Sequence, residues 1–253
     1  MSNYKPYFRY IKDMNMKIIL IFAFIMCINA SLSIVGTVKS SEYQNGTINF
    51  ISQCSISAGI ICLLVGLLYS LSIFASCMNI KADRVGYLKA VFLWGMILSV
   101  GFALFSFVFD TLCKVILEAW TDMPVNIYSQ MKWIDMRRIQ MDRDIISRII
   151  WNMAIFSLGF LVGAIWYRLK IRTSIVLFVI TPIAFVGYIT NFGIRNHGKI
   201  DILINNMCNT VEQLIENPVL INMIMSFGIL AFSVGGIILL IKAPIKEYAN
   251  DLL

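Results

Sequence analysis

The chain has 253 residues, of which 59% are hydrophobic and only 14% are charged, with a net charge of +7 and a mean hydropathy of +0.79. Soluble domains are about 45–50% apolar and about 25% charged, so one ordinary core of this size could not bury the excess. The composition excludes an ordinary soluble protein and predicts an all-α, multi-pass membrane protein, whose positive charge serves orientation and contact with anionic lipid rather than with nucleic acid.

Residues 1–16 predict a short basic helix on the membrane surface. One face has apolar and aromatic residues at helical spacing, namely Tyr4, Tyr7, Phe8, Ile11 and Met14. Basic residues fall off that face, namely Lys5, Arg9 and Lys12. Such a helix is expected to lie flat on the inner leaflet, and the alternative is a frayed tail. We expect its functional contacts from Tyr4, Phe8, Arg9 and Ile11.

Charged residues divide the rest of the chain into six long neutral runs. An Asp, Lys or Arg costs about 2.5–3.5 kcal/mol at the centre of a membrane helix, so charges mark the ends of spans. We expect one transmembrane domain over residues 1–253, with spans near 18–38, 52–78, 90–109, 149–167, 173–194 and 218–241. The first run is longer than the apolar part of a secretory signal and has no good cleavage site, so we interpret it as a retained span.

The connections between these spans carry their own signals. Residues 43–49 are polar and turn-prone, which places the start of the second span near Ser52. Residues 111–120 contain no helix breaker, so the third helix is expected to continue beyond the membrane until Pro124 ends it. Residues 133–150 could form a helix that leads into the fourth span, and Pro218 is expected to begin the sixth.

An even number of spans places both termini on one side. With the amino terminus in the cytoplasm, more than half of the 21 Lys and Arg residues lie in inner segments, as the positive-inside rule requires. These inner residues are Lys5, Arg9, Lys12, Lys17, Lys81, Arg84, Lys89, Arg168, Lys170, Arg172, Lys242 and Lys246. We therefore predict cytoplasmic amino and carboxyl termini.

Catalytic and metal-binding patterns are missing from the sequence. The chain has one His, His197, in a predicted outer loop, and it has no phosphate-binding loop. The central parts of the six runs contain no Asp, Glu, Lys or Arg, which are the residues that ion-coupled carriers use. We expect no enzymatic activity, no metal and no cofactor. Cys113 and Cys208 could meet on the outer side as a disulfide, and the other cysteines are expected to act as small hydrophobic residues.

Small residues are frequent in the spans. Gly159 and Gly163 are four residues apart in the fourth span, and Gly59 and Gly66 lie in the second. Small residues allow membrane helices to approach closely. We expect them to serve packing within the chain, with a dimer interface or a weakly polar pathway as the alternatives.

The segment between the second and third spans reads Ser76-Cys77-Met78-Asn79-Ile80-Lys81-Ala82-Asp83-Arg84-Val85-Gly86-Tyr87-Leu88. It resembles the inner loop of bacterial type-2 ABC exporter permeases, in which a short basic turn with an Arg and an aromatic residue follow an aromatic-rich end of span two. Phe74, Arg84 and Tyr87 match that pattern, whereas Asn79 and Ala82-Asp83 replace its usual Gly and Ser-Arg-Lys residues. The length and the six spans also resemble this family, and exporters of phenol-soluble modulins are the subgroup most like it.

The resemblance implies a permease subunit in the bacterial cell membrane that moves an amphipathic or peptide-like substrate. A separate cytoplasmic ABC ATPase would hydrolyse ATP, and the permease would form a homodimer or pair with a related permease. The residues expected to contact the ATPase are Asn79, Lys81, Asp83, Arg84 and Tyr87. The alternative is a membrane immunity or scaffold protein that transports nothing and binds a partner through its outer loops. The inner segment could also be an ordinary positive-inside turn.

Overall fold

A computed structural model describes about three fifths of the chain. The described residues are 7, 11–12, 16–25, 27–28, 31, 43–44, 47–51, 54–79, 83–121, 125–128, 145–169, 173, 176, 180–181, 183–184 and 218–243. The helices are α2 (Cys54–Leu68), the π-helix η1 (Tyr69–Ile73), α3 (Phe74–Asn79), α4 (Arg84–Thr121), α5 (Ile145–Arg168) and α9 (Pro218–Ile241). The strands are β1 (Tyr43–Gln44), β2 (Thr47–Ile51) and β3 (Val125–Tyr128).

Four of the described helices are long and apolar enough to cross a membrane. They cover Cys54–Met78, Arg84–Trp120, Ile145–Arg168 and Val219–Ile241. The prediction of a helical, multi-pass membrane protein is therefore confirmed, and these helices coincide with the second, third, fourth and sixth predicted spans. A shorter apolar helix, Met16–Ile25, lies within the first predicted span. Most of the fifth, 173–194, lies outside the described residues.

Helix α4 is much longer than the predicted third span. Its 38 residues make it about 57 Å long, against a hydrocarbon core of about 30 Å. The predicted continuation through Trp120 is confirmed, and Pro124 follows the end of the helix after three residues. The helix also begins at Arg84 rather than near residue 90. Arg84, Tyr87 and Lys89 thus belong to the first turns of a helix and not to a loop.

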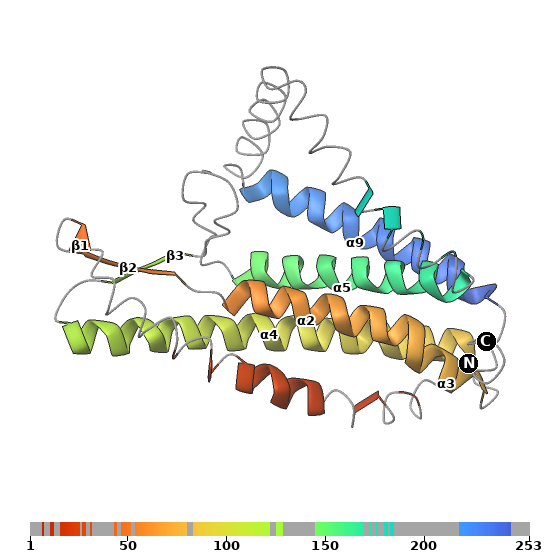
Figure 1. Cartoon of the computed structure of the whole chain (residues 1–253), viewed down its shortest axis with the longest axis horizontal. Coiled ribbons are helices and arrows are strands. Elements are labelled where there is room, and N and C mark those ends of the chain that lie inside the picture. Colours follow the sequence, from red (N-terminus) through yellow and green to blue (C-terminus); the bar gives the residue numbers. More distant parts are fainter. Residues whose placement is uncertain are drawn as a thin grey trace, which may run out of the picture.

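Helices α2, α5 and α9 run in the same direction, and α4 runs opposite to them (Figure 1). At one end, Asn222 Nδ2 donates a hydrogen bond of 2.9 Å to Ser147 Oγ, which joins the starts of α9 and α5. At the other end, Arg168 Nη2 donates one of 3.0 Å to the Lys242 carbonyl, which joins their last residues. We call the first the sheet end, because the strands lie there, and the second the junction end.

The sheet has three short strands in the order β1-β2-β3. β1 and β2 are antiparallel, with Gln44 opposite Thr47, and β2 is parallel to β3, with Ile48 opposite Val125. It connects the segment before α2 to the segment after α4 (Figure 1). The sequence predicted only a polar turn here. The two residues between β1 and β2 read Asn45-Gly46, which is a common turn sequence in two-residue hairpins and was the available signal.

Glycines bring the backbones of α2 and α5 into direct contact. A methyl group built on Gly159 would overlap the Leu63 carbonyl, and one on Gly66 would overlap the Phe156 carbonyl. A methyl group on Gly163 would lie 2.8 Å from the Leu67 carbonyl oxygen. Such close approach is the usual role of small residues in membrane helices. Packing within the chain, the preferred interpretation of these glycines, is confirmed.

Small polar side chains then form hydrogen bonds between the packed helices. Ser70 Oγ donates to the Phe160 carbonyl at 2.7 Å, linking η1 to α5. Ser233 and Ser157 hydroxyls lie 3.2 Å apart between α9 and α5. Asn152 Nδ2 donates to the Ser99 carbonyl of α4 at 3.4 Å. Helix α5 is therefore the central helix of the described bundle, bonded to all three neighbours.

Replacing Gly159 with Leu should destabilise the bundle, because the new side chain would force α2 away from α5. Overpacking of this kind costs about 1–3 kcal/mol of unfolding free energy. The matched control is Gly101→Leu in α4, where a methyl group would meet nothing within 4 Å. Thermal unfolding of the purified protein in detergent should show a clear loss of stability for Gly159→Leu only. Equal melting temperatures for the two variants would contradict the contact.

Candidate functional site

The α3–α4 connection ends in a helix cap built by Asp83. Its carboxylate oxygens accept hydrogen bonds from the backbone N–H groups of Val85 and Gly86, both at 3.2 Å. Its carbonyl accepts one from the Tyr87 N–H at 3.0 Å. The first N–H groups of a helix have no partner inside the helix, and Asp is a preferred residue for satisfying them. Asp83 therefore fixes where α4 begins and how the connection enters it.

The amino-terminal segment contacts this cap through Tyr7. The backbone N–H of Asp83 donates a hydrogen bond of 2.8 Å to the Tyr7 hydroxyl. The Tyr7 ring also packs edge-to-face on the Tyr87 ring, with centroids 6.4 Å apart. Residues 76 positions apart in the sequence thus form one contact. A displacement of the α3–α4 connection would act directly on the amino-terminal segment.

Two arginines bind the carboxyl end of α9. Arg84 Nη1 donates a short hydrogen bond to the Ile241 carbonyl, and Arg168 Nη2 donates one to the Lys242 carbonyl. The last carbonyl groups of a helix lack partners within the helix and carry partial negative charge, so cations there are stabilising. The start of α4 and the end of α5 are therefore both tied to the end of α9.

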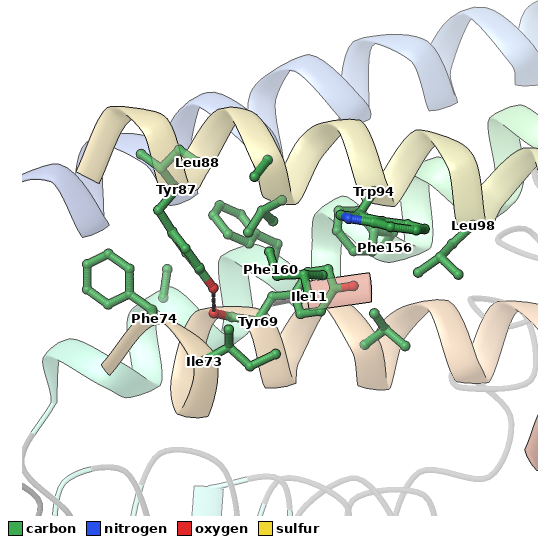
Figure 2. Close-up of a cluster of buried hydrophobic side chains, with 14 of the residues drawn as sticks. Ile11, Tyr69, Ile73, Phe74, Tyr87, Leu88, Trp94, Leu98, Phe156 and Phe160 are labelled. Atoms are coloured by element: carbon green, nitrogen blue, oxygen red, sulfur yellow. Dashed lines mark hydrogen bonds between the residues drawn. The ribbon is translucent and has the colours of Figure 1, made fainter. Parts of the chain in front are cut away.

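Buried aromatic rings, among them Tyr69, Phe74 and Tyr87, pack together near the start of α4 (Figure 2). The Tyr87 side chain is fully buried, and its hydroxyl donates a hydrogen bond of 2.5 Å to the Tyr69 carbonyl of η1. Phe74 packs edge-to-face on Tyr87 and on Tyr167, at centroid distances of 5.6 and 5.2 Å. We call the cap, the two arginine contacts and these rings the junction. It joins the amino-terminal segment, α3, α4, α5 and α9.

The predicted coupling residues are only partly brought together. Asp83, Arg84 and Tyr87 all belong to the junction, and Asn79 is the last residue of α3. Lys81 lies outside the described residues. Asp83 and Arg84, which are predicted to contact a partner protein, also form hydrogen bonds within the chain. The reason is that each lies at a helix end, where backbone groups need partners.

The predicted surface helix is described at few positions. Ile11 is fully buried against the protein, so its side chain packs in the hydrophobic core and not in the lipid headgroups. Tyr4, Phe8 and Arg9 lie outside the described residues. The prediction missed the direct contact of Tyr7 with the connection, and it missed the roles of Tyr69, Arg168 and the Ile241 carbonyl. The apolar periodicity around Tyr7 was a signal for packing, but the sequence does not show against what.

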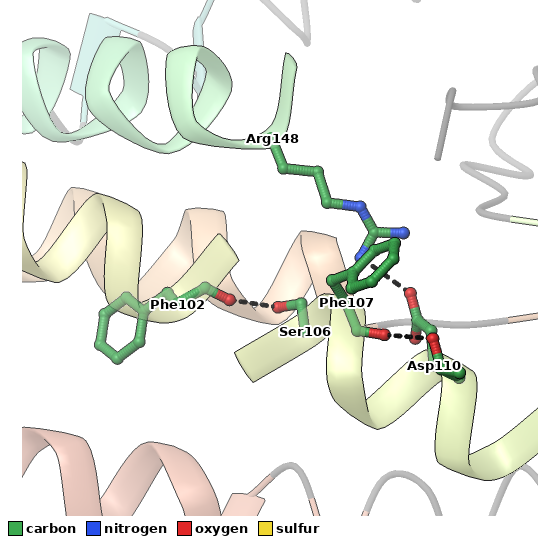
Figure 3. Close-up of polar contacts among 6 residues, drawn as sticks. Phe102, Ser106, Phe107, Asp110 and Arg148 are labelled. Atoms are coloured by element: carbon green, nitrogen blue, oxygen red, sulfur yellow. Dashed lines mark hydrogen bonds and ion pairs between the residues drawn. The ribbon is translucent and has the colours of Figure 1, made fainter. Parts of the chain in front are cut away.

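The sheet end has a charged contact of a different kind. Arg148 Nη1 of α5 lies 2.8 Å from Asp110 Oδ2 of α4, and both side chains are largely buried (Figure 3). This distance makes the contact an ion pair between α4 and α5. On the same helix, Lys114 and Glu118 form a more exposed pair at 3.5 Å. The sequence placed Asp110 at a span boundary, but gave no sign that it pairs with Arg148.

The two ends differ in charge. Among the described residues from Cys54 onward, the junction end has Arg84, Lys89, Arg168 and Lys242 with the single acid Asp83. The sheet end has Lys114 and Arg148, which are matched by Asp110 and Glu118. Within the described part of the chain, no group of three His, Cys, Asp or Glu side chains could hold a metal. The junction is thus a set of contacts between helix ends with an excess of positive charge.

Replacing Arg84 with Met should loosen the last turn of α9, since Met keeps much of the apolar stem but cannot bond the Ile241 carbonyl. We expect a loss of about 1 kcal/mol and faster hydrogen exchange in residues 237–243. The control is Lys89→Met, which removes an exposed cation five positions further along α4. Mass spectrometry of deuterated peptides should show the change for Arg84→Met alone. Identical exchange in both variants would contradict a stabilising contact between Arg84 and the end of α9.

Comparisons with protein-family models, with curated proteins and with solved structures give no match. The observations that bear on a function are the junction, the charge of the two ends and the apolar membrane helices between them.

Proposed function

We propose that this chain is the membrane permease subunit of an ATP-driven exporter of the type-2 ABC class, and that a separate cytoplasmic ATPase drives it. The observation that carries the proposal is the junction. One short connection, capped by Asp83, is bonded to the amino-terminal segment through Tyr7 and to α9 through Arg84. A force applied there by an ATPase would reach the described helices at their common end.

The proposal includes six spans, and the directions of the helices support that number. Helix α5 ends at the junction end, whereas α9 begins beside Ser147 at the sheet end. The chain between them must cross from one end to the other. Tyr7 likewise lies at the junction end, and α2 begins at the sheet end, where a methyl group on Gly59 would contact Trp151. One further crossing in each interval gives six.

The proposal places the junction end in the cytoplasm of a bacterial cell. From Cys54 onward, its described side chains have four cations and one acid, whereas the charges at the sheet end balance. An excess of Lys and Arg marks the cytoplasmic side of a membrane protein. This orientation would give both chain termini a cytoplasmic location and would place β1, β2 and β3 outside.

The described membrane helices have no charged group in their central parts that could serve an energy source of their own. Helices α2 and α9 contain no Asp, Glu, Lys or Arg, α4 contains none between Lys89 and Asp110, and α5 contains none between Arg148 and Arg168. Ion-coupled carriers use such groups in mid-membrane. A transporter built from these helices needs an external motor, and its apolar surfaces suit an amphipathic or peptide-like substrate better than an ion.

A second permease copy, identical or related, is part of the proposal. Helix α9 packs on α5 by one side, where Gly236 admits the Phe160 ring. Its other side exposes apolar residues along its whole length: Val219, Met223, Phe227, Leu230, Val234, Ile238 and Ile241. Lipid or a second permease can cover this side, and the exporter proposal requires a partner there or on α4.

The alternative function, binding of a partner at the outer surface without transport, has one observation in its favour. The last turns of α4 extend beyond the ends of its neighbours at the sheet end and expose apolar residues, among them Trp120 at 70% (Figure 1). A scaffold or immunity protein would use such a surface. This alternative function does not explain why the amino-terminal segment, α3, α4, α5 and α9 are all bonded together at the opposite end, the junction end.

Affinity purification from native membranes should bring down an ATPase with a phosphate-binding loop. The double variant Asp83→Ala and Arg84→Ala should reduce the co-purified ATPase several-fold, since it removes the cap and the α9 contact together. The matched control, Lys114→Ala and Glu118→Ala, removes a charged pair at the other end of the same helix and should leave the yield unchanged.

Thermal unfolding of each purified variant separates loss of binding from loss of fold. An unchanged yield of ATPase with a folded junction variant would remove the coupling role of the connection. Absence of any ATPase from the native complex, under conditions that retain other membrane partners, would contradict the exporter proposal itself.

A further inference from the structure

Helices α2 and α3 form one rod that is interrupted by a single turn of π-helix. Leu68 before η1 and Phe74 after it both have ordinary α-helical angles, with φ of −61° and −58°. The Phe74 N–H donates to the Tyr69 carbonyl, five residues earlier. A turn of this kind corresponds to one extra residue in an α-helix, and such turns are rare and occur often at functional positions.

The rod is held tightly on the α2 side of η1. A methyl group on Gly163 of α5 would lie 2.8 Å from both the Leu67 carbonyl and the Ser70 Cβ. Ser70 Oγ donates to the Phe160 carbonyl at 2.7 Å. Backbone contacts of this closeness leave no room for sliding, because atoms already touch. Residues up to Ser70 are therefore fixed to α5.

On the α3 side the contacts change in kind. Phe74 meets its neighbours through ring edges, at 5.6 Å from Tyr87 and 5.2 Å from Tyr167. Edge-to-face pairs tolerate a range of geometries, whereas a backbone contact does not. The boundary between the fixed and the adjustable part of the rod thus falls inside η1.

One hydrogen bond crosses this boundary from α4. The Tyr87 hydroxyl donates at 2.5 Å to the Tyr69 carbonyl, the same oxygen that accepts the Phe74 N–H across the π-turn (Figure 2). A carbonyl oxygen has two lone pairs and can accept both donors. Tyr87 therefore stabilises the wide turn at the residue where it begins, and it links that turn to the start of α4.

We propose that η1 is a hinge, and that the Tyr87 hydroxyl is the latch that holds it in the observed state. Opening the latch lets α3 move against the fixed α2–α5 pair by shifting the wide turn along the rod. The inference goes beyond the proposed function, because the hinge is a property of this chain whatever pushes the junction.

The test is hydrogen exchange of the purified chain in lipid nanodiscs, without any partner protein. In the unmodified chain, the amides of residues 73–78 should exchange at least about tenfold faster than those of residues 60–67, because the hinge opens locally. Tyr87→Phe should speed residues 73–78 a further fivefold or so, which is what one lost hydrogen bond predicts. Ser106→Ala, which removes a buried hydroxyl that donates to the Phe102 carbonyl within α4, away from η1 and the junction, should leave them unchanged.

A second variant for the same exchange experiment lacks Ser72, an exposed residue of η1. Removing one residue should close the wide turn into ordinary α-helix, keep the faces of α2 and α3 in place, and slow residues 73–78 to within about twofold of residues 60–67. Deletion of the exposed Met96 in regular α4 is the control and should disrupt the fold, since it rotates all later residues by about 100°.

Three results would overturn the hinge. The first is a Ser72 deletion that unfolds as the Met96 deletion does. The second is a folded Ser72 deletion whose residues 73–78 exchange as in the unmodified chain. The third is a Tyr87→Phe variant with unchanged exchange in this segment. None of these depends on an ATPase, so failure of the hinge and failure of the exporter proposal are distinguishable.

Discussion

The close approach of α2 and α5 is the contact on which the rest of the described structure depends. Lipid tails are as apolar as leucine, so membrane helices gain nothing from hiding apolar side chains and must gain from close packing and shared hydrogen bonds. Gly66 and Gly159 provide that closeness by bringing each backbone against a carbonyl of the other helix. Because the backbones touch there, Ser70 can reach the Phe160 carbonyl.

Glycines also allow close packing between α5 and its other two neighbours, α4 and α9. Phe156 and Phe160 project from it into spaces left by other glycines: Gly95 of α4 admits the Phe156 ring, and Gly236 of α9 admits the Phe160 ring. The positions of the three neighbouring helices therefore depend on two features. One is the position of the aromatic rings on α5, and the other is the position of the glycines at each contact. This explains why a bundle with few charges keeps a defined arrangement, and why the junction forms where the helices end.

The sequence predicted those features that depend on the difference between lipid and water, namely the positions of the membrane helices. Charges such as Lys89 and Asp110 bounded the neutral runs, and four of the resulting spans coincide with helices. Pro218 marked the start of α9 as predicted. The helix ends, in contrast, depend on the hydrogen-bonding needs of the backbone, which hydropathy does not report. Helix α4 begins at Arg84 rather than near residue 90, because Asp83 satisfies its first N–H groups.

The candidate site could be located from the sequence but not built from it. The basic connection and Tyr87 pointed to the right region, since their residue types mark a membrane boundary. Their partners are mostly backbone carbonyls, of Tyr69, Ile241 and Lys242, and every residue has a carbonyl. Only the packing of the helices decides which of them an arginine or a tyrosine can reach. The π-turn in α2 likewise has no signature in the apolar pattern.

The transport proposal depends on a junction end that faces the cytoplasm, and site-specific labelling tests this orientation most directly. A cysteine at Val85, which is 46% exposed beside the cap, reports the junction end, and a cysteine at Trp120 reports the other end of α4. With a membrane-impermeant maleimide, and with the unmodified chain as background, we predict that Trp120→Cys reacts in intact cells and that Val85→Cys reacts only after permeabilisation. Reaction of Val85→Cys in intact cells would contradict the account.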